Sequence, residues 1–172
     1  MKSYVVLFRG INVGGKNSLP MKELATALEE NGYQNVKTYI QSGNVVLQGK
    51  AVSPADIAKL VTAEFGFDPD IIILEKSAFL LSIQHNPFQL NEGKSAHFYF
   101  CSKKPKLNPE KLEKYLADSE EYKLIDKVFY LHAPNGIGHS KLVANLESCL
   151  GVRVTGRNFN TIRKLAQMLK NA

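Results

Sequence analysis

The sequence has few cysteines and no long apolar run. Only two of its 172 residues are cysteines, Cys101 and Cys149, and no C-x-x-C pair occurs. A zinc site or a thioredoxin-like redox motif is not indicated, and we expect neither a metal nor a cofactor. Both cysteines stand among apolar residues, as buried and unreactive thiols do. No apolar segment approaches the roughly 18 residues of a membrane helix, so we expect a cytoplasmic protein without a membrane partner.

The patterns that identify common catalytic sites are also missing. No H-E-x-x-H motif and no paired-carboxylate pattern occurs. His132, His139, Ser140 and Lys141 could supply an acid, a base or a nucleophile, but no carboxylate is evident nearby to orient a histidine. The sequence therefore leaves open whether the protein is an enzyme.

Positive charge is in excess. Lysine and arginine number 22 against 16 aspartates and glutamates, a formal net charge of +6. Such an excess favours anionic partners such as phosphates, nucleotides or nucleic acids. Solubility alone is the competing explanation.

The first half of the sequence alternates between strand and helix patterns. β-branched and aromatic residues predict strands over 3–9, 36–40, 44–48 and 70–75. Apolar residues at helical spacing predict helices over 20–32 and 53–66. A tight turn at 41–43 joins the middle strands. The order β-α-β-β-α-β is the ferredoxin-like motif.

The second half repeats this order after a linking helix at 76–86. Strands are predicted over 96–101, 122–125, 128–132 and 152–156, and helices over 108–119, 139–151 and 158–170. We therefore expect an α+β fold that duplicates two ferredoxin-like units with antiparallel sheets. The first unit is expected over 1–78, and the second over 79–172 with an added C-terminal helix.

Polar loops gather at one end of each predicted sheet, because the β-α-β crossings fix which loops share an end. The first-half group is Arg9, Asn12, Gly14, Gly15, Lys16, Gln41, Ser42 and Asn44. In the second half a loop over 132–141 is expected to meet a turn over 155–161. That group is His132, Asn135, His139, Ser140, Lys141, Thr155, Arg157, Asn158, Asn160 and Thr161. If the two ends adjoin, they form one composite cleft.

The chemistry of these loops suits an anion. Glycines let backbone N–H groups approach a ligand, helix N-termini add donors, and arginine forms a planar fork for phosphate. The loops contain no acidic residue over 10–19, 132–141 or 155–164. We therefore expect a phosphorylated small molecule or a nucleotide as ligand. The competing explanation is that glycines make turns and that Asn, Ser and Thr cap helices.

The segment Gly10–Lys16 fits the spacing G-x-x-x-x-G-K of a phosphate-binding P-loop. A P-loop needs Ser or Thr directly after the lysine to hold magnesium, and Asn17 stands there instead. The strands that follow form a hairpin, whereas P-loop folds have a parallel sheet. The sequence therefore disfavours a P-loop nucleotidase.

Nucleic-acid binding is the alternative function. RNA-recognition motifs share the β-α-β-β-α-β order and stack bases on aromatic residues of the central strands. His97 and Tyr99 share a face of one strand, and Tyr130 and His132 share a face of the next strand. If that face is open, it is a stacking platform. Four lysines lie nearby in the sequence, namely Lys94, Lys103, Lys104 and Lys106. The RNP1 pattern itself is absent.

Four ordered segments, RGINVGG, QSGNVV, NGIGHSKL and GRNFNT, carry a resemblance that covers nearly the whole chain. The chain resembles a bacterial family catalogued as domain of unknown function 1697. The resemblance implies two ferredoxin-like units and no known activity. The family's recurrent polar positions match Arg9, Gly10, Asn12, Gly14, Gly15, Gln41, Ser42, Gly43, Asn44, Lys141, Arg157 and Asn158. Two positions depart from it: His139 where arginine is frequent, and Phe159 where tryptophan is frequent.

Overall fold

The computed structural model describes residues 1–89 and 92–170. The chain divides into two compact units, each described here by itself. The first unit comprises Met1–Leu81 together with the chain from Lys164 onward, and the second unit comprises Ser82–Arg163. The sequence, by comparison, predicted domains over 1–78 and 79–172.

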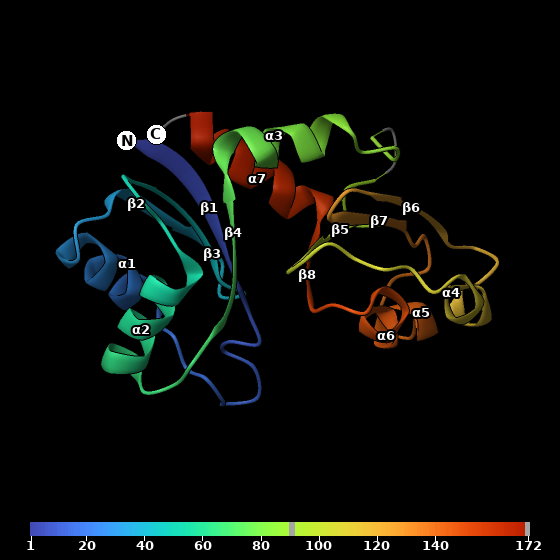
Figure 1. The fold of residues 1–172 in the computed structure, drawn as a ribbon, viewed down its shortest axis with the longest axis horizontal. Helices are drawn as coiled ribbons and strands as arrows, with labels where there is room; N and C mark the ends of the chain where they lie inside the picture. The colour runs from blue at the N-terminus through green and yellow to red at the C-terminus, as the bar shows by residue number, and fades with distance from the viewer. Residues whose placement is uncertain (90–91, 171–172) are drawn as a thin grey trace. The chain divides into compact units, whose positions relative to one another are not determined.

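The first unit contains a four-stranded antiparallel sheet with two helices in its connections (Figure 1). Its elements are β1 (Lys2–Arg9), α1 (Met21–Glu30), β2 (Gln34–Tyr39), β3 (Asn44–Gly49), α2 (Pro54–Phe65) and β4 (Asp70–Glu75). The strands lie in the order β2-β3-β1-β4. This is the ferredoxin-like order that the sequence predicted.

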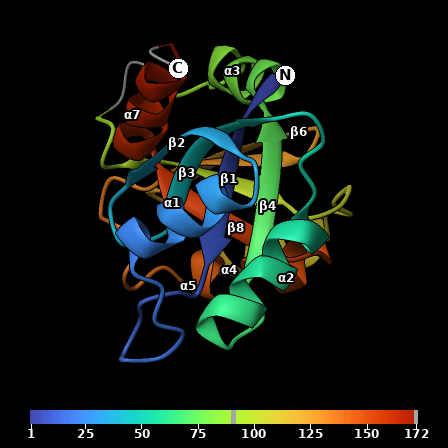
Figure 2. The same ribbon diagram turned by 90° about the vertical axis from the view of Figure 1, so that its left-hand side faces the viewer.

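The helices α1 and α2 cover one face of this sheet (Figure 2). Leu24 and Leu28 lie one helical turn apart on α1, Ile57 and Val61 do so on α2, and all four are fully buried. They pack in one core cluster with Phe8 of β1. Full burial of each such side chain contributes about 1.5–3 kcal/mol to folding, so the apolar helical spacing accounts for this layer.

The second unit repeats the arrangement. Its elements are β5 (Ala96–Cys101), α4 (Pro109–Tyr115), β6 (Glu121–Ile125), β7 (Val128–His132), α5 (Lys141–Ala144), α6 (Leu146–Leu150) and β8 (Val154–Asn158). The strand order is β6-β7-β5-β8, with β5 antiparallel to both of its neighbours. In the chain, α3 (Lys76–Gln84) precedes β5, and α7 (Phe159–Lys170) follows β8 directly. The predicted duplication is confirmed.

The central strand β5 is buried along its whole length. All six of its residues are buried. On one face Tyr99 belongs to a core cluster with Phe129 and with residues of α4, α5 and α6. On the other face Phe98 stacks on Phe159 at 5.6 Å between ring centroids and meets Tyr130 edge-on at 4.8 Å. Neither face of β5 is open.

Three elements differ from the sequence prediction. The helix expected over 108–119 ends at Tyr115, because Leu116 adopts an extended conformation. The helix expected over 139–151 is interrupted at Asn145, where φ is −118° and the side-chain Nδ2 donates to the Lys141 carbonyl at 2.8 Å. That bond competes with the helical backbone for the same carbonyl. The prediction of a turn over 155–161 was wrong, because β8 continues to Asn158 and pairs with β5 up to that residue.

The helices of the protein are short. Among the described residues the longest, α2 and α7, have 12 residues each. No helix within residues 1–89 and 92–170 is long and apolar enough to cross a membrane.

Two glycines with positive φ allow the cost of backbone strain alone to be compared with the cost of strain plus a steric clash. A Cβ at Gly43 (φ +93°) would lie 2.6 Å from Cβ of Phe8, whereas a Cβ at Gly10 (φ +69°) would meet nothing within 4 Å. Gly10→Ala should cost about 1 kcal/mol of unfolding free energy through strain alone. Gly43→Ala should cost about 3 kcal/mol, because overpacking adds to the strain. Equal midpoints for the two variants in urea denaturation would contradict this account.

Candidate functional site

The glycine-rich loop after β1 is a small hairpin that extends past the end of the strand (Figure 2). Gly14 (φ +58°) and Gly15 (φ +74°) occupy its turn, and positive φ at both central residues is the geometry of a type I′ turn. The N–H of Lys16 donates to the Val13 carbonyl at 3.0 Å, and the N–H of Asn12 donates to Asn17 at 3.1 Å. These N–H groups are used within the hairpin rather than turned toward a phosphate, in agreement with the conclusion against a P-loop.

Asn12 joins this loop to the β2–β3 hairpin. Its Nδ2 donates to the Leu19 carbonyl at 2.9 Å and to the Gln41 carbonyl at 3.0 Å, while its Oδ1 accepts the N–H of Leu19 at 2.7 Å. The predicted meeting of the two loops is therefore confirmed. The amide of Asn12 has a structural task at this junction, and its role as a ligand contact stays a prediction.

The neighbouring polar residues are likewise held by the fold. The Nδ2 of Asn44, which is fully buried, donates to the Tyr39 carbonyl at 2.9 Å and to Oγ of Ser42 at 3.1 Å. Arg9 is half-buried, and the strand register places it directly opposite Asp70 of β4. A carboxylate therefore lies across from this arginine on the adjacent strand, although the loop itself has no acid.

In the second sheet, the C-terminal ends of β7 and β8 flank the start of β5, which is the opposite end from that of the first unit's loops in the shared strand order. The register pairs Ala96 with His132 of β7 and His97 with Asn158 of β8. The ends of β7 and β8 therefore lie at one end of the sheet as expected, while the approach of residues 135–141 to residues 155–161 stays a prediction. Whether this end and the first unit's loops share one cleft stays a prediction.

The segment that leads into α5 is tied to a buried carboxylate. Oγ of Ser140 donates to Oε2 of Glu120 at 2.6 Å and accepts the N–H of Val143 at 3.2 Å. Glu120 is only 8% exposed. Ser140 is therefore occupied in capping the helix and satisfying this carboxylate, while His139 and Lys141 are exposed on either side of it.

Arg157 and Asn158 lie in β8 rather than in a turn. The Nη1 of Arg157 donates to the Gly156 carbonyl at 2.8 Å, and burial lowers the pKa of its guanidinium to about 10. The group still carries its charge at neutral pH. Oδ1 of Asn158 accepts the N–H of Thr161 at 2.9 Å, which caps the start of α7.

A pocket of about 550 Å³ opens at this end of the second sheet. Its lining comes from the turn before β5 and from the end of β7, namely Glu92, Lys94, Ser95, His132, Ala133, Pro134 and Gly136. Its size is that of small-molecule sites. The sequence analysis singled out His132 but missed Glu92 and Ser95. The predicted strand order could have indicated these residues, because the start of β5 lies beside the end of its antiparallel neighbour β7.

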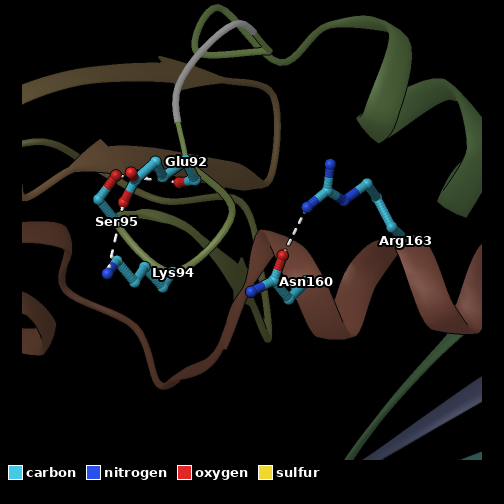
Figure 3. Close-up of polar contacts among 5 residues, drawn as sticks. All are labelled: Glu92, Lys94, Ser95, Asn160 and Arg163. Carbon is cyan, nitrogen blue, oxygen red and sulfur yellow. Dashed lines mark hydrogen bonds and ion pairs between the residues drawn. The ribbon is translucent and has the colours of Figure 1, made fainter.

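The turn before β5 is packed against the first turn of α7 (Figure 3). The Asn160 N–H donates to the Gly93 carbonyl at 3.3 Å, and Asn160 Oδ1 accepts a bond from Arg163. A Cβ at Gly93 would lie 2.0 Å from that Oδ1. Within the turn, Oγ of Ser95 donates to the Glu92 carbonyl at 2.9 Å, and the ammonium of Lys94 lies 3.5 Å from the Glu92 carboxylate. The pocket wall thus rests on a well-supported turn.

His132 has aromatic and acidic neighbours. Its ring stacks on Phe88 at 5.7 Å between centroids, and its Nδ1 lies 3.6 Å from Oε1 of Glu121, its register partner on β6. The expectation that no carboxylate lies near this histidine was wrong. The distance exceeds that of a hydrogen bond, and the Glu121 side chain is 71% exposed, so the attraction is weak.

The aromatic platform suggested for nucleic acids is not formed by Tyr99 and Tyr130. The register pairs Tyr99 with Phe129 and Phe98 with Tyr130, which puts the two tyrosines on opposite faces of the sheet. Tyr99 is 6% exposed and Tyr130 is 1% exposed, and the Tyr130 hydroxyl donates to the Ser82 carbonyl at 2.6 Å. Base stacking on either ring is excluded by burial.

His97 and Tyr99 each bury a polar atom that no hydrogen bond satisfies among the described residues. These atoms are Nε2 of His97 and the hydroxyl oxygen Oη of Tyr99. The His97 ring bonds the backbone of Lys94, and burial lowers its pKa. Burial, together with the charge of Glu120, raises the pKa of Tyr99. Both groups are thus neutral at pH 7, and an unsatisfied buried polar group costs about 1–3 kcal/mol.

Both cysteines are buried as expected. Burial raises the pKa of the Cys101 thiol to about 11, so little of the reactive thiolate is present at neutral pH. In residues 1–89 and 92–170, no group of three or more His, Cys, Asp or Glu side chains is arranged to hold a metal ion.

Two similarly ordered sheets define the class of this protein as a duplicated ferredoxin-like α+β protein. The chain belongs to the family described as "Protein of unknown function (DUF1697)", which it matches over residues 1–130. Its fold is similar to the solved structure of the conserved bacterial protein SP0830 from Streptococcus pneumoniae. The TM-score is 0.73, with 23% identity over 98% of each chain, a likeness that shows the fold alone. No curated protein matches the sequence.

The buried imidazole of His97 predicts a pH dependence of stability. Because the folded-state pKa lies below the ordinary value of 6.5, the unfolded chain binds the proton first as the pH falls. The stability that this group contributes is present above about pH 6.5 and is lost as the pH falls through the folded-state pKa. His97→Gln should lessen the fall in urea midpoint between pH 7.5 and 5.5. The exposed His139→Gln is the control, and equal slopes for wild type and His97→Gln would contradict the prediction.

Proposed function

We propose that this protein binds a phosphate-bearing small molecule in the pocket at the end of the second sheet. The observation that carries the proposal is the pocket itself, in which Lys94 and His132 supply an ammonium and an imidazole. A cation and a ring together suit a phosphate ester with an organic group. The net charge of +6 favours the approach of such an anion.

A carboxylate in the pocket lining already lies close to the lysine that is proposed to bind the phosphate. The carboxylate of Glu92 lies 3.5 Å from the ammonium of Lys94, and the two side chains are 73% and 76% exposed. An exposed pair of this kind contributes little, so an incoming phosphate competes with Glu92 at small cost. A compact phosphate accepts several hydrogen bonds at once and therefore gains more from Lys94 than a carboxylate does.

Arg157, Lys141 and Arg9 are also proposed as contacts to an anion, from the sequence pattern. Arg157 has the strongest physical basis, since burial lowers the pKa of its guanidinium to about 10. A partly desolvated cation gains more from an anionic ligand than an exposed one does. Arg157→Ala should reduce the thermal shift that an anionic ligand gives.

The test is a thermal-shift panel of inorganic phosphate, nucleotides, sugar phosphates and nucleic acids, because a ligand of the native state raises the melting temperature. Lys94→Glu should abolish the shift given by the best phosphate ligand. Lys104→Glu, which changes the net charge equally at an exposed residue outside the pocket lining, should keep it. The proposal fails if no phosphate compound gives a shift, or if the two variants lose it equally. A shift with nucleic acids alone would favour the alternative function.

A further inference from the structure

The pocket before β5 presents charges of both signs to a ligand. Its lining includes the ammonium of Lys94 and the carboxylate of Glu92, and the atoms Nζ and Oε2 of this pair lie 3.5 Å apart (Figure 3). A second carboxylate, that of Glu121, has Oε1 at 3.6 Å from Nδ1 of the lining residue His132. Both glutamate side chains are largely exposed, so their charges can interact with a molecule that enters the pocket.

The backbone from which the Glu92 and Lys94 side chains project is fixed. The Glu92 carbonyl accepts the N–H of Ser95 at 3.0 Å, the N–H of Ala96 at 3.2 Å and the hydroxyl of Ser95 at 2.9 Å. The carboxylate and the ammonium therefore start from positions two residues apart on one closed turn. The fold places the two opposite charges beside each other at the pocket before any ligand arrives.

This set of charges disfavours a ligand that is only anionic. Among the described residues that line the pocket, Lys94 is the only permanent cation. A phosphate gains from this ammonium but is repelled by the carboxylate of Glu92, which lies close to it, and by that of Glu121 beside His132. A simple phosphate ester thus satisfies one of the charges at the pocket and opposes the others.

A ligand that carries an ammonium group as well as a phosphate removes this conflict. Its phosphate can lie next to Lys94 while its ammonium lies next to Glu92. The four charges then alternate in sign, and the ion pair of the protein does not have to break. A short spacer between the two groups of the ligand suits this arrangement, because Nζ of Lys94 and Oε2 of Glu92 are only 3.5 Å apart.

We propose that the ligand is zwitterionic, an aminoalkyl phosphate whose ammonium group is bound by Glu92. This inference rests on the proposed function, because it names the second charged group of the same ligand. Glu92 is then a specificity-determining residue, which favours phosphate esters with a nearby amine over esters without one.

Titration calorimetry at low salt with two probes tests the proposal. The probes are 2-aminoethyl phosphate and n-propyl phosphate, which have similar shapes and differ by an ammonium group in place of a methyl group. Wild type should bind 2-aminoethyl phosphate about two- to fivefold more tightly, the range for an ion pair between exposed groups. Glu92→Gln keeps the shape of the side chain and removes its charge, so the ratio of the two affinities should fall to about one.

The matched control is Glu113→Gln. Glu113 is an exposed residue of α4 outside the pocket lining, and its substitution changes the net charge by the same amount. This variant should keep the wild-type ratio. If Glu113→Gln lowers the ratio as much as Glu92→Gln does, the preference comes from the overall charge of the protein, and the ammonium site is wrong.

The other outcomes separate this inference from the proposed function. If both probes bind wild type equally, or if the preference survives in Glu92→Gln, the ammonium site is wrong and phosphate binding stands. If neither probe binds, both proposals fail.

The headgroup of a phospholipid has the same chemistry as the first probe, and a vesicle experiment distinguishes the two sources. A free small molecule is the ligand proposed here, so vesicles of phosphatidylcholine and phosphatidylethanolamine should not sediment the protein. Cosedimentation that Glu92→Gln abolishes would assign the site to a lipid and would overturn the proposal of a free ligand.

Discussion

The burial of β5 on both faces is the constraint on which the second unit depends. All six residues of the strand are buried, and successive side chains enter opposite layers. Phe98 packs with Phe159 and Tyr130 in one layer, while Tyr99 packs with Phe129 in the other. The central strand therefore has no face on which a ligand can stack. The pocket lies at the strand ends.

The two halves of the duplicated fold differ in whether the polar groups of their loops bond one another or line a pocket. In the first unit the amide of Asn12 closes the long loop onto the β2–β3 hairpin, and the Gly14–Gly15 turn closes the loop on itself. The polar groups there largely satisfy one another. In the second unit the pocket lies at the opposite end of the shared topology, where β5 begins and where β7 and β8 end. The shared topology therefore does not by itself determine which end of a sheet keeps a cavity.

Hydrophobic periodicity and turn residues were enough to predict both sheets, since each helix and strand of the first unit has a clear period. They were not enough to predict which strand faces coincide. The sequence does not determine the register between two strands, and a change of one residue in register moves every side chain to the other face. The observed register places Tyr99 and Tyr130 on opposite faces of the sheet. The TGRN segment was misjudged because its glycine and asparagine are typical of turns, yet β5 pairs with it. The pocket before β5 was not predicted, because Ser95 lies in a turn that no sequence motif marked.

Amide chemical-shift mapping with inorganic phosphate tests most directly the claim that binding occurs at the end of the second sheet. The account predicts that the amide signals of residues 92–97 and 132–136 shift in a saturable manner. Signals of the loop at 10–19 and the hairpin at 40–44 should stay unchanged, because their polar groups are held within the first unit. Saturable shifts confined to 10–19 and 40–44, with the pocket residues unaffected, would contradict it.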